Sequence, residues 1–586
     1  MKKVVSKFFG ALVMISIVYC KSASSQDHKP NVVLILTDDQ GWGDLSLNGN
    51  PVLETKNLDN LAIEGTRLNN FYVSPLCAPT RAGILTGRYH LQTGVVSVSN
   101  GLEIMKSDET TLAELFKANG YQTGAFGKWH NGAHYPNRPN DQGFDEFLGF
   151  TEGHLSNYFN TDLNRNGKTV KTKGYISDVL TDEAIQFIDK NKDKPFFCYV
   201  PYNAPHSPFQ VPDKYFDKYK GKNLDDELAT VYGMVENVDD NVGRLLKYLK
   251  DKNLEENTIV IFMTDNGPNG LRYNGVMRGI KGSVHEGGVR VPFFIKWPGK
   301  IKSQTVEETL TANIDIYPTL LELCKLEPIA TKPLDGISFA SLLLDRPSSL
   351  IENRKIFTNV NFMQIPASLN AGGFRDNQYR YVYEQNESQL YFLKVDPLEQ
   401  NDLAKKEPQL TSKYELAYKQ WFASATAELT YNNPVILSAK GLELPSYEAV
   451  LTTGLKYKEG HGWAHDWIAT WPSTNDSLYW KIDCEKAGNY QLEIEYLCSK
   501  GNKGSKLLVR VGDQQKQVKL RKRTSELVHS PDRVKRKEAY EIKKWGKLSI
   551  GNFYISEGKH QITIKASDLV GDNVMDFNKL IIRNKE

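Results

Sequence analysis

Two shortages in this sequence exclude whole classes of protein. Its 586 residues carry almost no net charge, because 73 lysines and arginines are balanced by 70 aspartates and glutamates. Nucleic-acid binding needs a basic excess that neutralises phosphates, so we expect no nucleic-acid partner. Beyond the first 25 residues no apolar run is long enough to cross a bilayer, so we expect no membrane span. The length exceeds what one hydrophobic core supports, and two or three domains are expected.

The N-terminus has the pattern of an export signal. Positive charge in residues 1–7 precedes an apolar stretch over residues 8–19 that is too short to span a bilayer. Small residues lie just before Gln26, where we expect a leader peptidase to cut. A lipoprotein anchor at Cys20 is the rival interpretation, but Tyr19 is bulky where a small residue is expected. The mature protein should therefore be periplasmic or secreted.

Cysteine is rare, and its number becomes odd once the export signal is removed. The remaining five are Cys77, Cys198, Cys324, Cys484 and Cys498. An odd number in an exported protein leaves at least one thiol unpaired or modified. Cys198 lies in the apolar run 196–200 and is expected in a buried strand, whereas Cys484 and Cys498 are close enough in sequence to pair.

The first 350 residues alternate between patterns typical of buried strands and of helices. Residues 31–36 and 258–263 are short continuous apolar runs, as in strands that are buried on both faces. Residues 225–251 repeat apolar side chains at intervals of three and four, which predicts an amphipathic helix. Strands that alternate with helices over about 300 residues predict an α/β sandwich.

The pattern changes after residue 350. Two strands and a helix are expected first, at residues 379–383, 390–393 and 407–425. Apolar and polar side chains then alternate, which predicts a β-sandwich, at residues 489–496, 506–511 and 560–565. The expected divisions are a signal peptide at 1–25, a large α/β domain at 26–350, a C-terminal subdomain at 351–430 and the sandwich at 431–586.

Both long apolar runs end in acidic or amide side chains. The first is followed by Asp38 and Asp39, and the second by Asp265 and Asn266. Ligands of open α/β sheets bind beyond the carboxyl ends of the strands, so these four side chains would meet there. Three carboxylates repel one another unless a hard cation lies among them, and oxygen ligands suit Ca²⁺ or Mg²⁺. Either pair alone would more often be an ordinary turn.

A third element, Cys77-Ala-Pro-Thr-Arg81 followed by Leu85-Thr-Gly-Arg88, favours the cation site. A thiolate is a soft ligand and suits a hard cation poorly. The segment closely resembles the signature at which sulfatases have a cysteine oxidised to formylglycine. The resemblance implies that Cys77 becomes formylglycine (3-oxoalanine), whose hydrate is a hard oxygen ligand and a nucleophile. The mismatch between thiol and cation would then disappear.

Further motifs, in the order found in the sulfatase family, extend the resemblance over roughly residues 30–405. They are Gly127–His130, Asn203–His206, Gly279–Gly282, Glu286–Pro292 and Val395–Leu403, of which the last is expected to be structural. The resemblance implies an alkaline-phosphatase-like α/β fold, with a large mixed, mainly parallel sheet between helices and a small antiparallel C-terminal subdomain. The all-β sandwich would be an addition to that fold.

The resemblance also assigns residues to the site. The metal would be Ca²⁺, as is usual in the sulfatase family, although the oxygen ligands would also suit Mg²⁺. It would be held by Asp38, Asp39, Asp265, Asn266 and the modified Cys77. The catalytic residues besides Cys77 would be Arg81, Lys128, His130, His206 and Lys281.

In the family mechanism, one oxygen of the hydrated formylglycine attacks sulfur in line. His206, assisted by Lys281, would protonate the leaving alcohol. His130 would then take a proton from the other hydroxyl, so that the aldehyde re-forms and sulfate is expelled. Lys128 and Lys281 would balance the charge of the sulfate oxygens, and Arg81 would steady the hydrate.

Several polar residues near these motifs have both a functional and an ordinary structural interpretation. Four lie on apparent loops and could contact substrate, although such loop residues more often have no function: His134, Arg138, Asn269 and Arg272. Two others, His285 and Arg290, could orient the site or merely pair with acidic side chains.

A tryptophan cluster marks the start of the expected sandwich, at Trp463, Trp467, Trp471 and Trp480. Exposed tryptophans stack on sugar faces, which would suit a carbohydrate-binding domain. Buried tryptophans of a sandwich core are the more frequent case.

The resemblance implies a sulfuric ester hydrolase that removes O-sulfate from a carbohydrate, either a sulfated glycan or a polysaccharide. Its partners would be that substrate and a maturation enzyme, either formylglycine-generating or of the radical sulfatase-maturating type. One alternative is a phosphonate or phosphate ester hydrolase of the same superfamily. Another is a non-catalytic glycan-binding protein. The intact set of candidate catalytic residues is evidence against this alternative.

Overall fold

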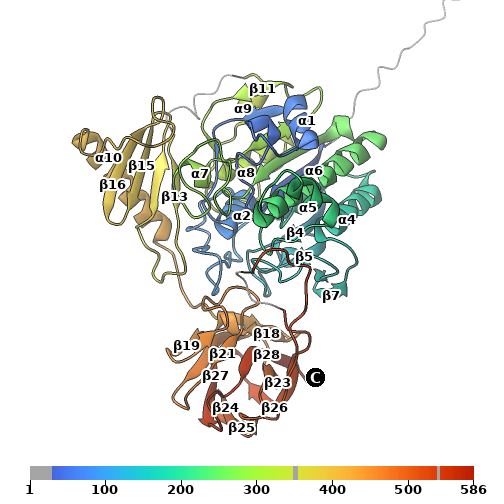
Figure 1. The fold of residues 1–586 in the computed structure, drawn as a ribbon, viewed down its shortest axis with the longest axis vertical. Coiled ribbons are helices and arrows are strands. Elements are labelled where there is room, and N and C mark those ends of the chain that lie inside the picture. The colour runs from blue at the N-terminus through green and yellow to red at the C-terminus, as the bar shows by residue number, and fades with distance from the viewer. Residues whose placement is uncertain (1–28, 347–353, 537–540, 586) are drawn as a thin grey trace, which may run out of the picture.

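The computed structural model describes residues 29–346, 354–536 and 541–585. The expected signal peptide and Cys20 lie outside the described residues. Within them, no helix is both long and apolar enough to cross a membrane. Figure 1 shows an α/β body around a central sheet, a small sheet beside that body, and a group of strands at the far end of the molecule.

A mixed, mostly parallel sheet of ten strands, counted over the described residues, runs through the α/β body. At its centre, β1 (Asn31–Thr37) runs parallel to β8 (Phe196–Pro201) and β9 (Thr258–Thr264). Every residue of these three strands is buried, as expected for strands covered on both faces. Beyond β9 lie β10 (Phe293–Lys296), β2 (Thr66–Leu68) and β11 (Thr305–Glu307). Beyond β8 lie β4 (Gln122–Lys128), β5 (Glu146–Phe150), β6 (Asp162–Arg165) and β7 (Lys168–Lys171).

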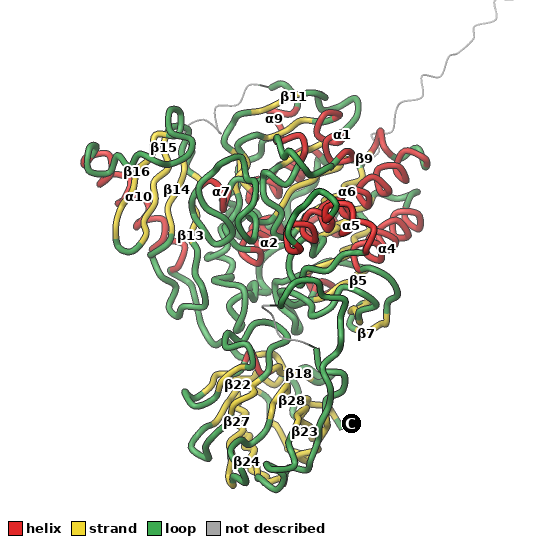
Figure 2. Tube along the Cα trace, in the orientation of Figure 1, coloured by secondary structure: helices red, strands yellow, loops and turns green. Residues whose placement is uncertain are grey.

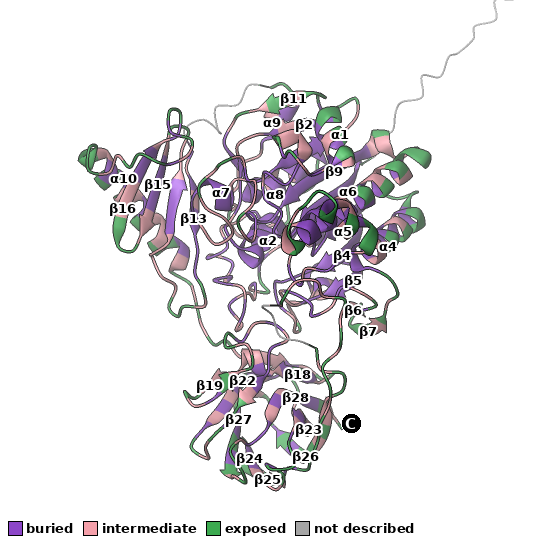
Figure 3. Ribbon diagram, in the orientation of Figure 1, coloured by how far each residue is buried: buried purple, intermediate pink, exposed green. Residues whose placement is uncertain are grey.

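Helices cover both faces of this sheet. The core on one face includes residues of α2 (Cys77–Thr86), α3 (Leu112–Ala118) and α8 (Ile316–Leu323). The core on the other includes residues of α1 (Lys56–Glu64), α4 (Ile176–Asn191) and α6 (Asp226–Asp251). The remaining helices of the body are α5 (Asp213–Lys220), α7 (Glu286–Val289) and α9 (Ala340–Leu343). In Figure 3 the central strands are buried and the outer faces of α4 and α6 are exposed.

Short elements complete the body. A separate two-stranded sheet pairs β3 (Phe71–Tyr72) with β12 (Thr311–Ala312). Single 3₁₀ turns occur at η1 (Ser46–Asn48), η2 (Pro139–Gln142), η3 (Glu255–Asn257) and η4 (Asn313–Asp315). The α/β prediction is confirmed. The helix expected at 225–251 is confirmed as α6. Asp225 caps it by accepting a hydrogen bond from the N–H of Leu228.

The smaller sheet beside the body is antiparallel and is packed against one helix. Its strands are β13 (Ile356–Asn359), β14 (Gly372–Arg375), β15 (Tyr379–Glu384) and β16 (Glu387–Phe392), and the helix is α10 (Pro408–Thr426). The second expected strand is β16, which begins at Glu387, three residues before the predicted start at residue 390. The reason is the two-residue turn at Gln385 and Asn386, both of which have positive φ and bring the two strands together at once.

Two sheets at the far end form the expected β-sandwich around one apolar core. One contains β17 (Val435–Leu437), β19 (Val450–Leu451), β22 (Ser477–Cys484), β24 (Lys506–Val511), β25 (Gln514–Lys519) and β27 (Gly558–Asp568). The other contains β18 (Leu442–Pro445), β20 (Lys456–Tyr457), β21 (Ile468–Thr470), β23 (Gly488–Leu497), β26 (Gly546–Ile555) and β28 (Asp576–Asn584). The turn η5 (Ser446–Glu448) follows β18. Figure 2 shows loops filling most of the space between this sandwich and the α/β body.

The suggested pairing of Cys484 with Cys498 is wrong. Both are free, buried thiols; Cys484 ends β22 in one sheet and Cys498 follows β23 in the other. Their sulfur atoms instead lie near the carbonyl oxygens of Lys486, at 3.2 Å, and Ser499, at 3.5 Å. Cys198 lies in β8, as the apolar run predicted.

Candidate active site

The ends of β1 and β9 bring four polar side chains to one edge of the central sheet. Thr37 pairs with Thr264 in parallel register, so the residues after each strand lie side by side. Asp38, Asp39, Asp265 and Asn266 are all fully buried. The backbone N–H of Asp39 donates to Oδ1 of Asp265 at 3.2 Å, which ties the two strand ends together.

Three oxygen atoms of this cluster accept no hydrogen bond from the described residues. They are Oδ1 of Asp38, Oδ2 of Asp39 and Oδ1 of Asn266. Buried polar atoms are normally paired, and an orphaned one indicates an ion, a water or a ligand. Ligand atoms of Asp38, Cys77 and Asp265 all lie within 4.8 Å of one another, as do those of Asp38, Asp39 and His206. An oxygen-rich set of this kind fits a hard divalent cation.

Cys77 lies beside these carboxylates as the first residue of α2. Its side chain is buried, with 3% of the residue exposed. Burial raises the pKa of the thiol above its ordinary value, although Lys128 and Lys281 oppose the shift. A thiol that stays protonated is a weak nucleophile and a poor ligand for a hard cation. The unmodified side chain is therefore chemically unsuited to the place it occupies.

Three cationic side chains surround the carboxylates. Arg81 donates to Oδ2 of Asp265 at 2.8 Å and to the carbonyl oxygen of Lys128 at 2.8 Å. The ammonium of Lys128 lies 2.5 Å from Oδ2 of Asp38, and that of Lys281 lies 2.6 Å from Oδ1 of Asp39. The site therefore combines a cation pocket with fixed positive charges that could hold an anion.

Burial and neighbouring charges shift the pKa values of the carboxyl groups in opposite directions. Burial alone would raise the pKa of Asp38, but Lys128, His206 and Arg81 hold it well below its usual range. Burial and the neighbouring Asp38 together raise the pKa of Asp265 to about 7. Mutual repulsion of this kind is what a bound cation relieves.

Two histidines flank the cluster. Nε2 of His130 lies 2.9 Å from the carbonyl oxygen of Val98, while its Nδ1 is buried without a partner among the described residues. Nε2 of His206 lies 3.7 Å from Oδ2 of Asp39, and its Nδ1 lies 2.7 Å from the carbonyl oxygen of Ser207. Burial, reinforced by Lys128 for His130 and by Lys281 for His206, lowers the pKa of both rings. The lowered pKa values favour neutral rings, so His130 is suited to accept a proton, whereas His206 must first gain one before it can donate it.

The four candidate substrate contacts make different connections. Arg272 donates to both carboxylate oxygens of Asp44 and to the carbonyl oxygens of Asn269 and Asp39. Arg138 pairs with Asp141 in its own loop, at 2.7 Å.

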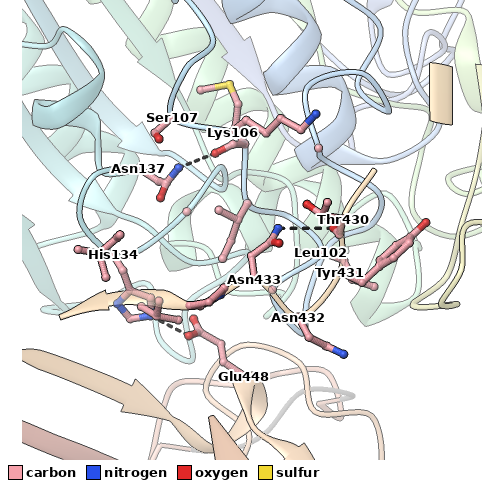
Figure 4. A pocket seen from close by; sticks show the side chains of 18 of the residues that line it. Leu102, Lys106, Ser107, His134, Asn137, Thr430, Tyr431, Asn432, Asn433 and Glu448 are labelled. Carbon is pink, nitrogen blue, oxygen red and sulfur yellow. Dashed lines mark hydrogen bonds and ion pairs between the residues drawn. The ribbon is translucent and has the colours of Figure 1, made fainter. Parts of the chain in front are cut away.

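His134 reaches away from the α/β body toward the sandwich. Its Nε2 lies 2.7 Å from a carboxylate oxygen of Glu448 in η5. Figure 4 shows this pair at the edge of a cavity of about 440 Å³, which is lined by both parts of the chain and by the segment around Tyr431 that joins them.

His285 and Arg290 also have partners. Nδ1 of His285 lies 3.0 Å from a carboxylate oxygen of Glu399, which belongs to the Val395–Leu403 motif. Arg290 donates to the carbonyl oxygen of Asn69 at 2.9 Å. His285 thus pairs with an acidic side chain, and Arg290 with the backbone.

Sequence patterns did not reveal three residues next to the site. The ring of His154 stacks on that of His206, with ring centres 6.0 Å apart, and the ring of His465 from the sandwich lies 5.8 Å from that of His154. Neither histidine belongs to a matching motif, so no local signal could have found it. Asn203 does lie in a matching motif, and both polar atoms of its buried side chain lack partners among the described residues.

Comparison with known proteins gives consistent matches. Residues 30–326 match the sulfatase family, and residues 280–420 match a family described as N-sulphoglucosamine sulphohydrolase, C-terminal. The uncharacterized sulfatase YdeN of Escherichia coli K12 is 30% identical in an alignment over 494 residues that covers 69% of this chain and 87% of that protein. The N-acetylgalactosamine-6-sulfatase of Mus musculus is 33% identical in an alignment over 369 residues that covers 56% of this chain and 69% of that protein. The crystal structure of Ps i-CgsB in complex with k-i-k-neocarrahexaose aligns with a TM-score of 0.64 and 30% identity, covering 69% of this chain and 95% of that one.

Proposed function

The chain belongs to the sulfatase family, and on that premise we propose that it removes O-sulfate from a sulfated carbohydrate by means of a formylglycine made from Cys77. The observation that carries the proposal is the position of Cys77. Its sulfur lies within 4.8 Å of carboxylate oxygens of Asp38 and Asp265, next to buried oxygens without partners among the described residues. A soft, protonated thiol has no evident role there, whereas an oxygen nucleophile would have one.

The metal ligands in this proposal are the oxygens of Asp38, Asp39, Asp265 and Asn266, with the modified residue 77. We propose Ca²⁺, with Mg²⁺ as the second choice, because all these ligands are oxygen atoms. When bound, such a cation would neutralise the carboxylates and polarise an oxygen of the sulfate ester. The hydrate of formylglycine would supply the nucleophile.

The surrounding side chains supply charge and protons. Lys128 and Lys281 lie on two sides of the carboxylate cluster, where their ammonium groups would balance the negative oxygens of the sulfate. Arg81 is fixed by Asp265 and would orient residue 77 from four residues further along α2. His206 would give a proton to the leaving alcohol with help from Lys281, and His130 would take a proton from residue 77.

A carbohydrate substrate is supported by the relatives. One is named for N-acetylgalactosamine-6-sulfate hydrolysis, and the aligned crystal structure holds a neocarrahexaose. We propose further that the protein is exported after cleavage before Gln26 and is activated by a maturation enzyme. The catalytic part would extend over 26–350, its subdomain over 351–430 and the appended sandwich over 431–586.

A substrate panel tests the proposal. The protein, co-expressed with a formylglycine-generating enzyme, is assayed on N-acetylgalactosamine 6-sulfate, a neocarrahexaose, other sulfated saccharides and matched phosphate esters. We expect turnover of at least one sulfated saccharide and none by Cys77→Ala. A large preference for phosphate esters, or equal turnover by Cys77→Ala, would contradict the proposal.

A further inference from the structure

A loop of the sandwich meets the α/β body at Asn100, directly beside the site. Asn100 follows Val98 by two residues, and the carbonyl oxygen of Val98 lies 2.9 Å from Nε2 of His130. With its amide nitrogen turned toward the sandwich, Asn100 donates to the carbonyl oxygens of Tyr447 and Gly462, at 2.8 and 3.1 Å. The sandwich is thus fixed two residues from the partner of a proposed catalytic histidine.

The same sandwich loop reaches the second catalytic histidine. His465, three residues after Gly462, contacts the ring of His154, and that ring stacks on His206. Gly153, just before His154, is packed against His130, because a Cβ at Gly153 would lie 2.7 Å from Nε2 of His130. Residues 462–465 therefore border the site near both His130 and His206.

A loop of the C-terminal subdomain borders the site at the same place. The backbone N–H of Met363 donates to Oγ of Ser97 at 3.1 Å, in the segment that contains Val98. The preceding residue, Phe362, lies over Gly282, since a Cβ there would be 2.6 Å from Cζ of its ring. Gly282 follows Lys281, which contacts Asp39. The subdomain loop thus lies beside a proposed catalytic lysine.

Each of these two loops carries an aromatic residue that is not buried. Phe362 is 57% exposed, although phenylalanine normally favours the interior. Trp463 is partly exposed and stacks on the ring of His461, with centres 4.7 Å apart and planes 19° from parallel. The other tryptophans of the cluster, Trp467, Trp471 and Trp480, are buried in the sandwich. Trp463 is therefore the one member of this cluster of four that is not buried.

We propose that Phe362 and Trp463 bind the sugar that carries the sulfate, so that the appended sandwich completes the substrate site instead of forming a separate binding domain. The inference rests on the proposed function. A pyranose ring has apolar C–H faces that stack on aromatic rings, and the charged sulfate would lie deeper, among Lys128, Lys281 and the carboxylates.

Four variants and a control test the inference in the full-length, matured protein. Phe362→Ala and Trp463→Ala remove the rings, whereas Phe362→Tyr and Trp463→Phe keep an aromatic face. Tyr554→Ala is the control, because Tyr554 is 55% exposed on β26 of the same sandwich. KM and kcat are measured with the panel saccharide of highest kcat/KM, and inorganic sulfate is measured as an inhibitor that occupies only the deep part of the site.

We expect each alanine variant to raise KM for the saccharide about tenfold, which corresponds to about 1.4 kcal/mol of binding free energy. The inhibition constant of inorganic sulfate should stay unchanged, and the aromatic variants and Tyr554→Ala should resemble the wild type. Alanine variants that match the wild type overturn the inference. So does a parallel rise in KM and in the sulfate inhibition constant, which would indicate general damage to the site. A wild-type protein without any sulfate-ester turnover would refute the proposed function itself, and the inference with it.

Discussion

Replacing Arg272 by alanine should destabilise the α/β body more than it weakens substrate binding. The guanidinium group makes three hydrogen bonds to the carboxylate of Asp44, at 2.7 to 2.9 Å. The exposed fractions of the two side chains are 4% and 0%. Removing one partner of a buried ion pair leaves the other charge uncompensated, at a cost of about 3–5 kcal/mol in the free energy of unfolding. We expect a loss of this size for Arg272→Ala.

Arg138→Ala is the matched comparison, because it removes an arginine that pairs with Asp141 on a partly exposed loop, with side-chain exposures of 28% and 17%. Exposed pairs of this kind contribute about 0–1 kcal/mol. Urea unfolding and steady-state kinetics should be measured on the same preparations. The double variant Asp44→Asn with Arg272→Gln, which removes both charges, should recover much of the stability that Arg272→Ala loses.

The alternative is that Arg272 serves the substrate and not the stability of the α/β body. An Arg272→Ala protein that is as stable as the wild type but has a strongly raised KM would show that Arg272 binds substrate. The reasoning from its contacts with Asp44 and with the carbonyl oxygen of Asp39 would then be refuted.

Three further predictions follow from the site and its surroundings. Lys128→Ala removes the ammonium 2.5 Å from Asp38 and should lower kcat by about 10²–10³, the range for loss of one charge-stabilising donor, while circular dichroism stays unchanged. Chelation by EDTA should abolish turnover and added Ca²⁺ should restore it; full activity after exhaustive chelation would count against the cation. Burial alone would lower the pKa of His134, but Glu448 raises that pKa above its ordinary value. The stabilisation by this pair is therefore full below about pH 6.5, the pKa of an unfolded histidine, and is lost as pH rises through the higher pKa of the folded state. Glu448→Gln should therefore destabilise the protein more at pH 6 than at pH 9 in thermal unfolding, and equal losses at both would refute the charge on His134.

The central sheet could be predicted because its sequence signals are local. A continuous apolar run identifies a strand buried on both faces, and the residue after it must lie at the edge of the sheet. Parallel pairing of β1 with β9 then brings Asp38 and Asp265 together, although they are 227 positions apart. The hairpin before β16 was placed three residues late, because positive φ at Gln385 and Asn386 left little mark on the pattern of apolar residues.

The connections around the site could not be predicted, because their partners are distant in sequence and follow no period. His134 meets Glu448 across 314 positions, and Arg272 meets Asp44 across 228. Nothing in either neighbourhood indicates the other member of the pair. The position of His465 beside His154 likewise depends on how the sandwich packs against the body. Tertiary packing alone determines which loop residues border the site.

The chemical state of residue 77 decides whether the protein turns over sulfate esters by means of formylglycine. Preparations made with and without a maturation enzyme can be digested, and mass spectrometry of the peptide that contains Cys77 gives the fraction converted to formylglycine. Specific activity on the sulfated saccharide should rise in proportion to that fraction and extrapolate to zero for pure thiol. Full turnover by a protein whose residue 77 is entirely cysteine would contradict the account.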